Sequence, residues 1–211
     1  MNRLKIFVAV AAVLAIVVLV TVIMLPGVPA RLDDAADCGN VAALINTDPA
    51  SAVAACRRQA DQGDAAAQTS LGKIYADGRG VPQDYAEAQR RFRLAANQGN
   101  ATAQYNLGLM YADGQGVAQD YAEAARWYRL AADQGQSDAQ NNLGIRYKRG
   151  QGVAQDYVQA YKWFKLSAAN ATRMADRARA ELNRDRVAAL MTPAQIAEAE
   201  NVAAGWTPIK P

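Results

Sequence analysis

A block of sequence recurs three times in this chain of 211 residues. It reads LGKIYADGRGVPQD from Leu71, LGLMYADGQGVAQD from Leu107 and LGIRYKRGQGVAQD from Leu143, so the interval is 36 residues each time. A fixed period of this size is typical of helical repeat arrays, in which one unit cannot bury its apolar face alone. The sequence therefore predicts a row of units that stack on one another.

Each unit predicts a helix, a turn and a second helix. In the second unit the first helix covers about 101–112, with Ala103, Leu107 and Met110 at helical spacing on one apolar face. We expect it to stop at Gly114, because a left-handed residue commonly follows the last helical turn. The second helix opens at Asp120, whose carboxylate can accept the unpaired amides of the first turn. The predicted fold class is an all-α solenoid.

One glycine stands in the middle of every first helix. A glycine there costs about 1 kcal/mol relative to alanine, so its recurrence needs a steric reason. We expect the second helix of each unit to approach the first closely at these points, which are Gly72, Gly108 and Gly144.

The combined pattern A-x3-LG-x2-Y-x2-G-x-GV-x2-D-x3-A-x6-A resembles the Sel-like repeat (SLR), a relative of the tetratricopeptide repeat. The resemblance covers residues 64–171 and implies a right-handed superhelix whose concave face is built mainly from first helices. It also implies non-enzymatic scaffold or adaptor work on other proteins, often at membranes or in the bacterial envelope. The third unit departs from the pattern at Lys148-Arg149, where the others have Ala-Asp, and at Ala171, where they have glycine.

The repeats divide the chain. Residues 26–37 form a predicted linker, 38–63 a degenerate first unit, and 64–99, 100–135 and 136–171 the three full units. Residues 172–211 are predicted to form capping helices that cover the last apolar face, with an apolar stripe on the first of them at Met174, Ala178 and Leu182.

Residues 1–25 have a different composition. An uncharged apolar run of about 20 residues, 6–25, is long enough to cross a ~30 Å hydrocarbon core as a helix. We favour an uncleaved transmembrane anchor over a signal peptide cleaved after Ala30, because signal h-regions are usually about 7–15 residues long. Arg3 and Lys5 would keep the N-terminus cytoplasmic. The predicted location is thus the bacterial inner membrane, single-pass, with a periplasmic C-terminal domain; the alternative is periplasmic or secreted after cleavage.

The chain has two cysteines, Cys38 and Cys56. An even pair in an exported domain predicts a disulfide, which here would join the two helices of the degenerate unit. The alternative is two buried thiols that act as small apolar side chains. Two thiols without histidine do not make a zinc site.

Composition excludes several classes of function. The chain has no histidine, which removes Ser-His-Asp and Cys-His catalysis and histidine metal sites. Its formal net charge is +3, of which Arg3 and Lys5 supply two, and nucleic-acid binding needs a larger basic excess. The repeated aspartates are explained as helix caps. We therefore predict no enzyme activity, no cofactor, no metal and no nucleic-acid partner.

Positions that vary between first helices are candidates for partner recognition, because repeated positions are explained by the core. Tyr105 is the strongest of them, since tyrosine offers a large contact area with a polar tip. The candidate partner-binding residues are Thr69, Lys73, Tyr105, Asn106, Leu109, Asn141 and Asn142.

The leading functional hypothesis is a membrane-held adaptor that faces the periplasm and binds a protein or peptide in its superhelical groove. The alternative, which the resemblance permits, is a secreted or periplasmic protein that binds cell-wall glycan or regulates an envelope enzyme.

Overall fold

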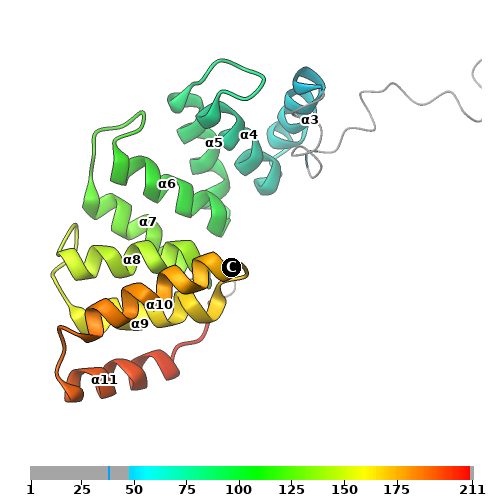
Figure 1. Cartoon of the computed structure of the whole chain (residues 1–211). Coiled ribbons are helices and arrows are strands. Elements are labelled where there is room, and N and C mark those ends of the chain that lie inside the picture. Colours follow the sequence, from blue (N-terminus) through cyan, green and yellow to red (C-terminus); the bar gives the residue numbers. More distant parts are fainter. Residues whose placement is uncertain (1–37, 39–47, 210–211) are drawn as a thin grey trace, which may run out of the picture. The chain divides into compact units, whose positions relative to one another are not determined.

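A computed structural model describes Cys38 and residues 48–209 of the chain. These residues contain helices and no strand, which confirms the predicted all-α class (Figure 1). The helices are α3 (Pro49–Asp61), α4 (Ala65–Asp77), α5 (Tyr85–Asn97), α6 (Ala101–Asp113), α7 (Tyr121–Asp133), α8 (Ser137–Arg149), α9 (Tyr157–Asn170), α10 (Met174–Ala188) and α11 (Pro193–Ala204).

The predicted anchor at 1–25, the linker at 26–37 and most of the first helix of the degenerate unit lie outside the described residues. Among the helices described, none combines the length and apolar character that a membrane crossing requires.

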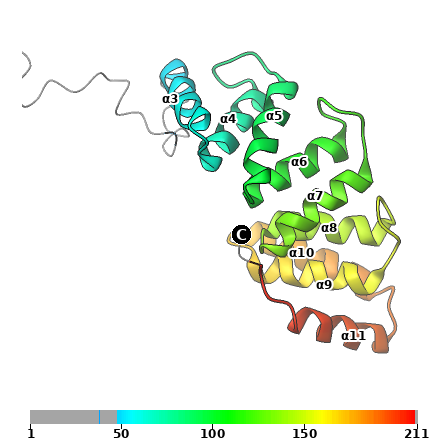
Figure 2. The same cartoon turned by 180° about the vertical axis from the view of Figure 1, so that it is seen from behind.

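Each full unit is a pair of consecutive helices. α4 packs on α5, α6 on α7 and α8 on α9, and each second helix also contacts the first helix of the next unit. Both views show these helices following one another in chain order (Figures 1 and 2). The core is accordingly a series of apolar clusters, each of which is shared by neighbouring pairs.

The mid-helix glycines lie where two helices of a unit touch. A Cβ added to Gly108 would lie 2.5 Å from two ring carbons of Tyr128, and the nearest ring carbons of Phe92 and Phe164 lie 2.7 Å from a Cβ on Gly72 and Gly144. The predicted close approach is confirmed. An aromatic ring of the second helix fills the space that a methyl group would need.

The turn glycines hold one unit against the preceding one. Gly116 has a φ of 71°, and a Cβ there would lie 2.5 Å from the Cβ of Tyr85. Tyr85 begins the second helix of the unit before it. The loop between α6 and α7 thus rests on the start of α5, and both the backbone conformation and the contact require glycine.

Buried amide side chains tie the units together at the other end of the helices. Gln134 Nε2 donates to Gln104 Oε1 at 2.8 Å, and Gln104 Nε2 donates to the Ala96 carbonyl of the preceding unit at 3.2 Å. The same pattern recurs one repeat earlier and one later. Because a buried amide is costly when unpaired, this ladder favours one register of stacking.

The helix caps follow the sequence prediction. The side chains of Asp84, Asp120 and Asp156 accept backbone amides of the first turns of α5, α7 and α9 at 2.8–3.1 Å. The first helices end on left-handed glycines, among them Gly114 with a φ of 70°. At the N-terminal end of the array Cys38 and Cys56 form a disulfide, as predicted.

The two last helices close the array differently from the prediction. Met174 is 88% exposed, and Ala178 and Leu182 are also exposed. The predicted stripe is therefore not the packed side of α10, which instead buries Ala180 and Val187. The reason is that α11 packs on α9 and not over this stripe of α10. The side of α10 that carries Met174, Ala178 and Leu182 therefore faces solvent.

Beyond α11 the chain turns back to α9 of the third unit and α7 of the second unit. The Trp206 ring meets the buried Trp163 ring edge-on, with centroids 6.5 Å apart. The Ile209 amide donates to the Asp133 carbonyl at 2.8 Å. These contacts tie residues 206–209 to α9 and α7.

Candidate functional site

Two of the predicted partner-binding residues are buried. Thr69 is 5% exposed, and its hydroxyl donates to the Ala65 carbonyl of its own helix at 2.7 Å. Asn141 is 3% exposed, and its Oδ1 accepts from Asn183 of α10 at 2.9 Å. The prediction that these two side chains face a partner is wrong, because both are buried and bond within the chain, Thr69 to its own helix and Asn141 to α10.

Tyr105 and Asn142 are half-buried and already have partners within the chain. The Tyr105 ring lies 6.1 Å from the Tyr128 ring, and burial, followed by the negative charge of Asp138, raises the pKa of its phenol. Asn142 hydrogen-bonds to the Tyr128 hydroxyl, whose pKa is raised mainly by burial. Both side chains support the packing of α7 against α6 and α8.

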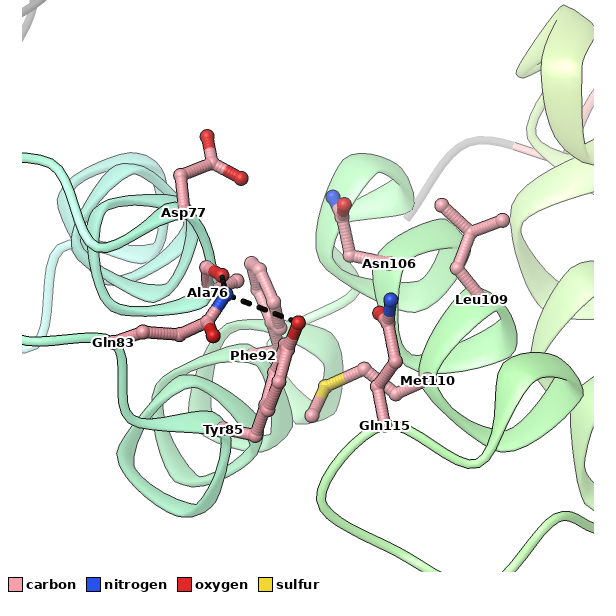
Figure 3. A pocket seen from close by; sticks show the side chains of 9 residues that line it. All are labelled: Ala76, Asp77, Gln83, Tyr85, Phe92, Asn106, Leu109, Met110 and Gln115. Carbon is pink, nitrogen blue, oxygen red and sulfur yellow. Dashed lines mark hydrogen bonds between the residues drawn. The ribbon is translucent and has the colours of Figure 1, made fainter.

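Asn106 and Leu109 lie together in a pocket of about 420 Å³ between α4, α5 and α6 (Figure 3). Lys73 is exposed one helical turn before Asp77 and does not line it. The lining residues are Ala76, Asp77, Gln83, Tyr85, Phe92, Asn106, Leu109, Met110 and Gln115.

The pocket has two polar walls and an apolar floor. Asp77 and Gln83 lie on one side, Asn106 and Gln115 on the other, and the Phe92 ring lies between them (Figure 3). The repeat architecture produces this arrangement, because neighbouring first helices stand on either side of the second helix that separates them.

Hydrogen bonds within the chain fix the walls. Gln83 Nε2 donates to the Ala76 carbonyl at 2.7 Å and to the Tyr85 hydroxyl at 3.0 Å. Asn106 Nδ2 donates to the Thr102 carbonyl at 2.7 Å. The pocket is therefore largely preformed.

Its electrostatic character favours a cation. Asp77 is the one side chain with a formal charge among the lining residues. α4 and α6 both end close by, and a helix C-terminus carries a partial negative charge. The positive N-terminus of α5 also lies there, but the Asp84 carboxylate caps it.

The lining combines one carboxylate with amides, a phenol and apolar groups. These groups can bind a ligand through charge, hydrogen bonds and apolar contact. Across Cys38 and 48–209, no cluster of acidic, cysteine or histidine side chains could hold a metal ion.

Sequence reasoning missed Gln83, Tyr85 and Gln115 because it considered first helices alone. The sequence does distinguish this site from the equivalent site one unit later. When the repeats are aligned, Met110 in the second unit stands at the position of Arg146 in the third.

The geometry agrees with the comparisons to known proteins. A family model described as the Sel1 repeat matches residues 65–100, 101–136 and 137–171, just over half of the chain. The chain belongs to the Sel1 repeat family. The Sel1 repeat fold is generally a protein–protein interaction scaffold. A search of curated proteins found no significant match to this chain.

Two solved structures show the same architecture. The first is c5321, described as a protective antigen present in uropathogenic Escherichia coli strains that displays an SLR fold, with 36% identity, a TM-score of 0.69 and coverage of 77% of this chain. The chain spans 35% of the length of c5321. The second is a Sel1 repeat protein from Oxalobacter formigenes, with 40% identity, a TM-score of 0.53 and coverage of 60% of this chain and 94% of that one.

Proposed function

We propose that this Sel1 repeat protein is a non-enzymatic adaptor that binds a segment of another protein on the face made by its first helices. The observation that carries the proposal is the pocket between α4 and α6. It is preformed, and its lining includes Asn106 and Leu109, which replace Ser70 and Lys73 of the preceding unit.

Rigidity of the stack supports this role. The glycine–aromatic contacts and the buried amide ladder hold neighbouring helices in one register. A surface that is already ordered loses little conformational entropy on binding. A short extended segment can then gain affinity from modest contacts.

The proposal includes attachment to a membrane, with the repeats facing the periplasm. Two features support it. The apolar run at 6–25 follows a short basic lead, which is the pattern of a helix with a cytoplasmic N-terminus. The Cys38–Cys56 disulfide is typical of an oxidising compartment outside the cytoplasm.

Site-specific photo-cross-linking in cells that make the full chain tests the binding face. A photoreactive amino acid at position 109 places the probe in the pocket of α6. The matched control is position 94, because Leu94 is also a leucine in a helix and is 41% exposed on α5. We expect a defined protein adduct from position 109 and none of the same mass from position 94. Equal adducts from both positions would contradict the proposal.

The attachment is tested by measuring the intact mass of the protein extracted from membranes. We expect the mass of all 211 residues. A mass that lacks residues 1–30 would show cleavage and would leave the adaptor without its tether.

A further inference from the structure

The pocket has a counterpart one repeat later, because each lining residue has an equivalent 36 positions on. Tyr85 corresponds to Tyr121, Phe92 to Tyr128 and Met110 to Arg146. The two sites therefore share a backbone plan and differ at a small number of side chains.

In the counterpart the chain supplies its own cation. The guanidinium carbon of Arg146 lies 4.9 Å from the centroid of the Tyr121 ring. The Tyr128 hydroxyl, which Phe92 lacks, is hydrogen-bonded to Asn142. Arg146 and Tyr128 thus bring to the counterpart a cationic group, and a second tyrosine hydroxyl beside that of Tyr121, which the equivalent residues Met110 and Phe92 do not supply to the first pocket.

At the first pocket the equivalent side chains are shorter or less polar. Met110 ends in an uncharged thioether and is buried against the core, so it places no charge over Tyr85. The pocket of about 420 Å³ lies at this place. The Asp77 carboxylate and the two helix C-termini give it a negative character.

We propose that this pocket binds the side chain of an arginine from the partner segment. The guanidinium stacks on the Tyr85 ring, as Arg146 does on Tyr121, and pairs with the Asp77 carboxylate, while the alkyl stem lies over Phe92 and Met110. Arginine fits better than lysine because its planar group can stack and form paired hydrogen bonds at the same time. This inference rests on the proposed function, since it names what the groove recognises.

The test uses the full-length chain with isotope-labelled methionine and leucine methyl groups, so that Met110 and Leu109 report from the pocket. The probes are the capped tripeptides Gly-Arg-Gly, Gly-Lys-Gly and Gly-citrulline-Gly; citrulline has the shape of arginine without the charge. We expect saturable shifts of the two methyl signals with the arginine peptide, several-fold weaker binding of the lysine peptide, and binding of the citrulline peptide at least tenfold weaker. Asp77→Asn, a change at an exposed residue, should lower the affinity for the arginine peptide about tenfold and leave the affinity for the citrulline peptide unchanged.

The repeats also provide a matched pair of variants. Phe92→Tyr with Met110→Arg gives the first pocket the residues of the second, and we expect it to lose binding of the arginine peptide. Tyr128→Phe with Arg146→Met makes the reverse exchange, and we expect new peptide-induced shifts at the Ile145 methyl groups in isoleucine-labelled protein. Far-UV circular dichroism checks that both variants fold.

Equal binding of the arginine and citrulline peptides, no binding of any peptide, or unchanged binding by Asp77→Asn would overturn the inference. The adaptor role fails separately. If position 109 still cross-links to a partner while the peptides do not discriminate, the pocket assignment is wrong and the adaptor stands. If the arginine peptide binds but position 109 cross-links to no partner, the pocket assignment stands and the adaptor role is wrong.

Discussion

Replacing Gly108 by alanine tests the packing of each unit directly. An alanine in mid-helix normally stabilises by about 1 kcal/mol relative to glycine. Here the new Cβ would lie 2.5 Å from two carbons of the Tyr128 ring and 3.1 Å from a third. Carbon atoms in contact are normally about 3.5–4.0 Å apart, so the ring must move by roughly 1 Å.

The ring has little room to move. Tyr128 is fully buried, its hydroxyl is hydrogen-bonded to Asn142, and Tyr105 packs beside it. Overpacking of a core costs about 1–3 kcal/mol, and the tightness of this contact places the cost near the upper end. After the gain in helix propensity, we expect Gly108→Ala to lower the free energy of unfolding by about 2 kcal/mol.

Urea unfolding followed by circular dichroism measures this change. Ala178→Gly, at an exposed mid-helix position of α10, calibrates the propensity effect at about 1 kcal/mol. In a Tyr128→Ala background the obstacle is gone, so Gly108→Ala should there stabilise by about 1 kcal/mol. The reasoning is refuted if Gly108→Ala stabilises the wild-type chain, or if its cost is the same with and without the Tyr128 ring.

Three further predictions concern other parts of the array. Reduction of the Cys38–Cys56 disulfide, whose cysteines are 18 residues apart, should lower the free energy of unfolding by about 3 kcal/mol; reductant should not affect the double serine variant. Gln104→Ala, which removes two hydrogen bonds made by a buried side chain, should cost about 1–3 kcal/mol, whereas Gln115→Ala at an exposed site should change stability by less than about 0.5 kcal/mol. Hydrogen bonds from Arg90 and Arg91 lower the pKa of Glu87 from 4.5 to about 2. The stability that the Glu87 carboxylate contributes is complete above its unfolded pKa of 4.5 and is lost as the pH falls toward about 2. Because solvent screens this ion pair, Glu87→Gln should lower the free energy of unfolding by only on the order of 1 kcal/mol at pH 7, and should not change it below pH 2. A pH-independent difference between the two proteins would contradict this assignment.

The repeated positions made most of the fold predictable. The period, the capping aspartates and the mid-helix glycines each have a local physical cause that acts three times in the same register. The glycine–aromatic contact is an example, because Gly108 in a helix is unfavourable unless something approaches it, and Tyr128 does.

The closing helices and the pocket were harder to predict because their contacts are not repeated. Met174 and Leu182 have helical spacing like any buried stripe, but α11 packs on α9 and leaves them exposed. Asn141 varies between units like a recognition residue, yet α10 buries it. The pocket depends on side chains from three helices and two loops, so no single helical face indicates it.

The affinity of the partner identified by cross-linking, measured for purified full-length variants, tests the central claim most directly. Leu109→Asp places a charge in the pocket wall, and Leu94→Asp places the same charge on exposed α5. If the first helices form the binding face, Leu109→Asp binds the partner at least tenfold more weakly than the wild-type chain and Leu94→Asp binds it equally well. An equal affinity for both variants, or a loss confined to Leu94→Asp, would contradict the account.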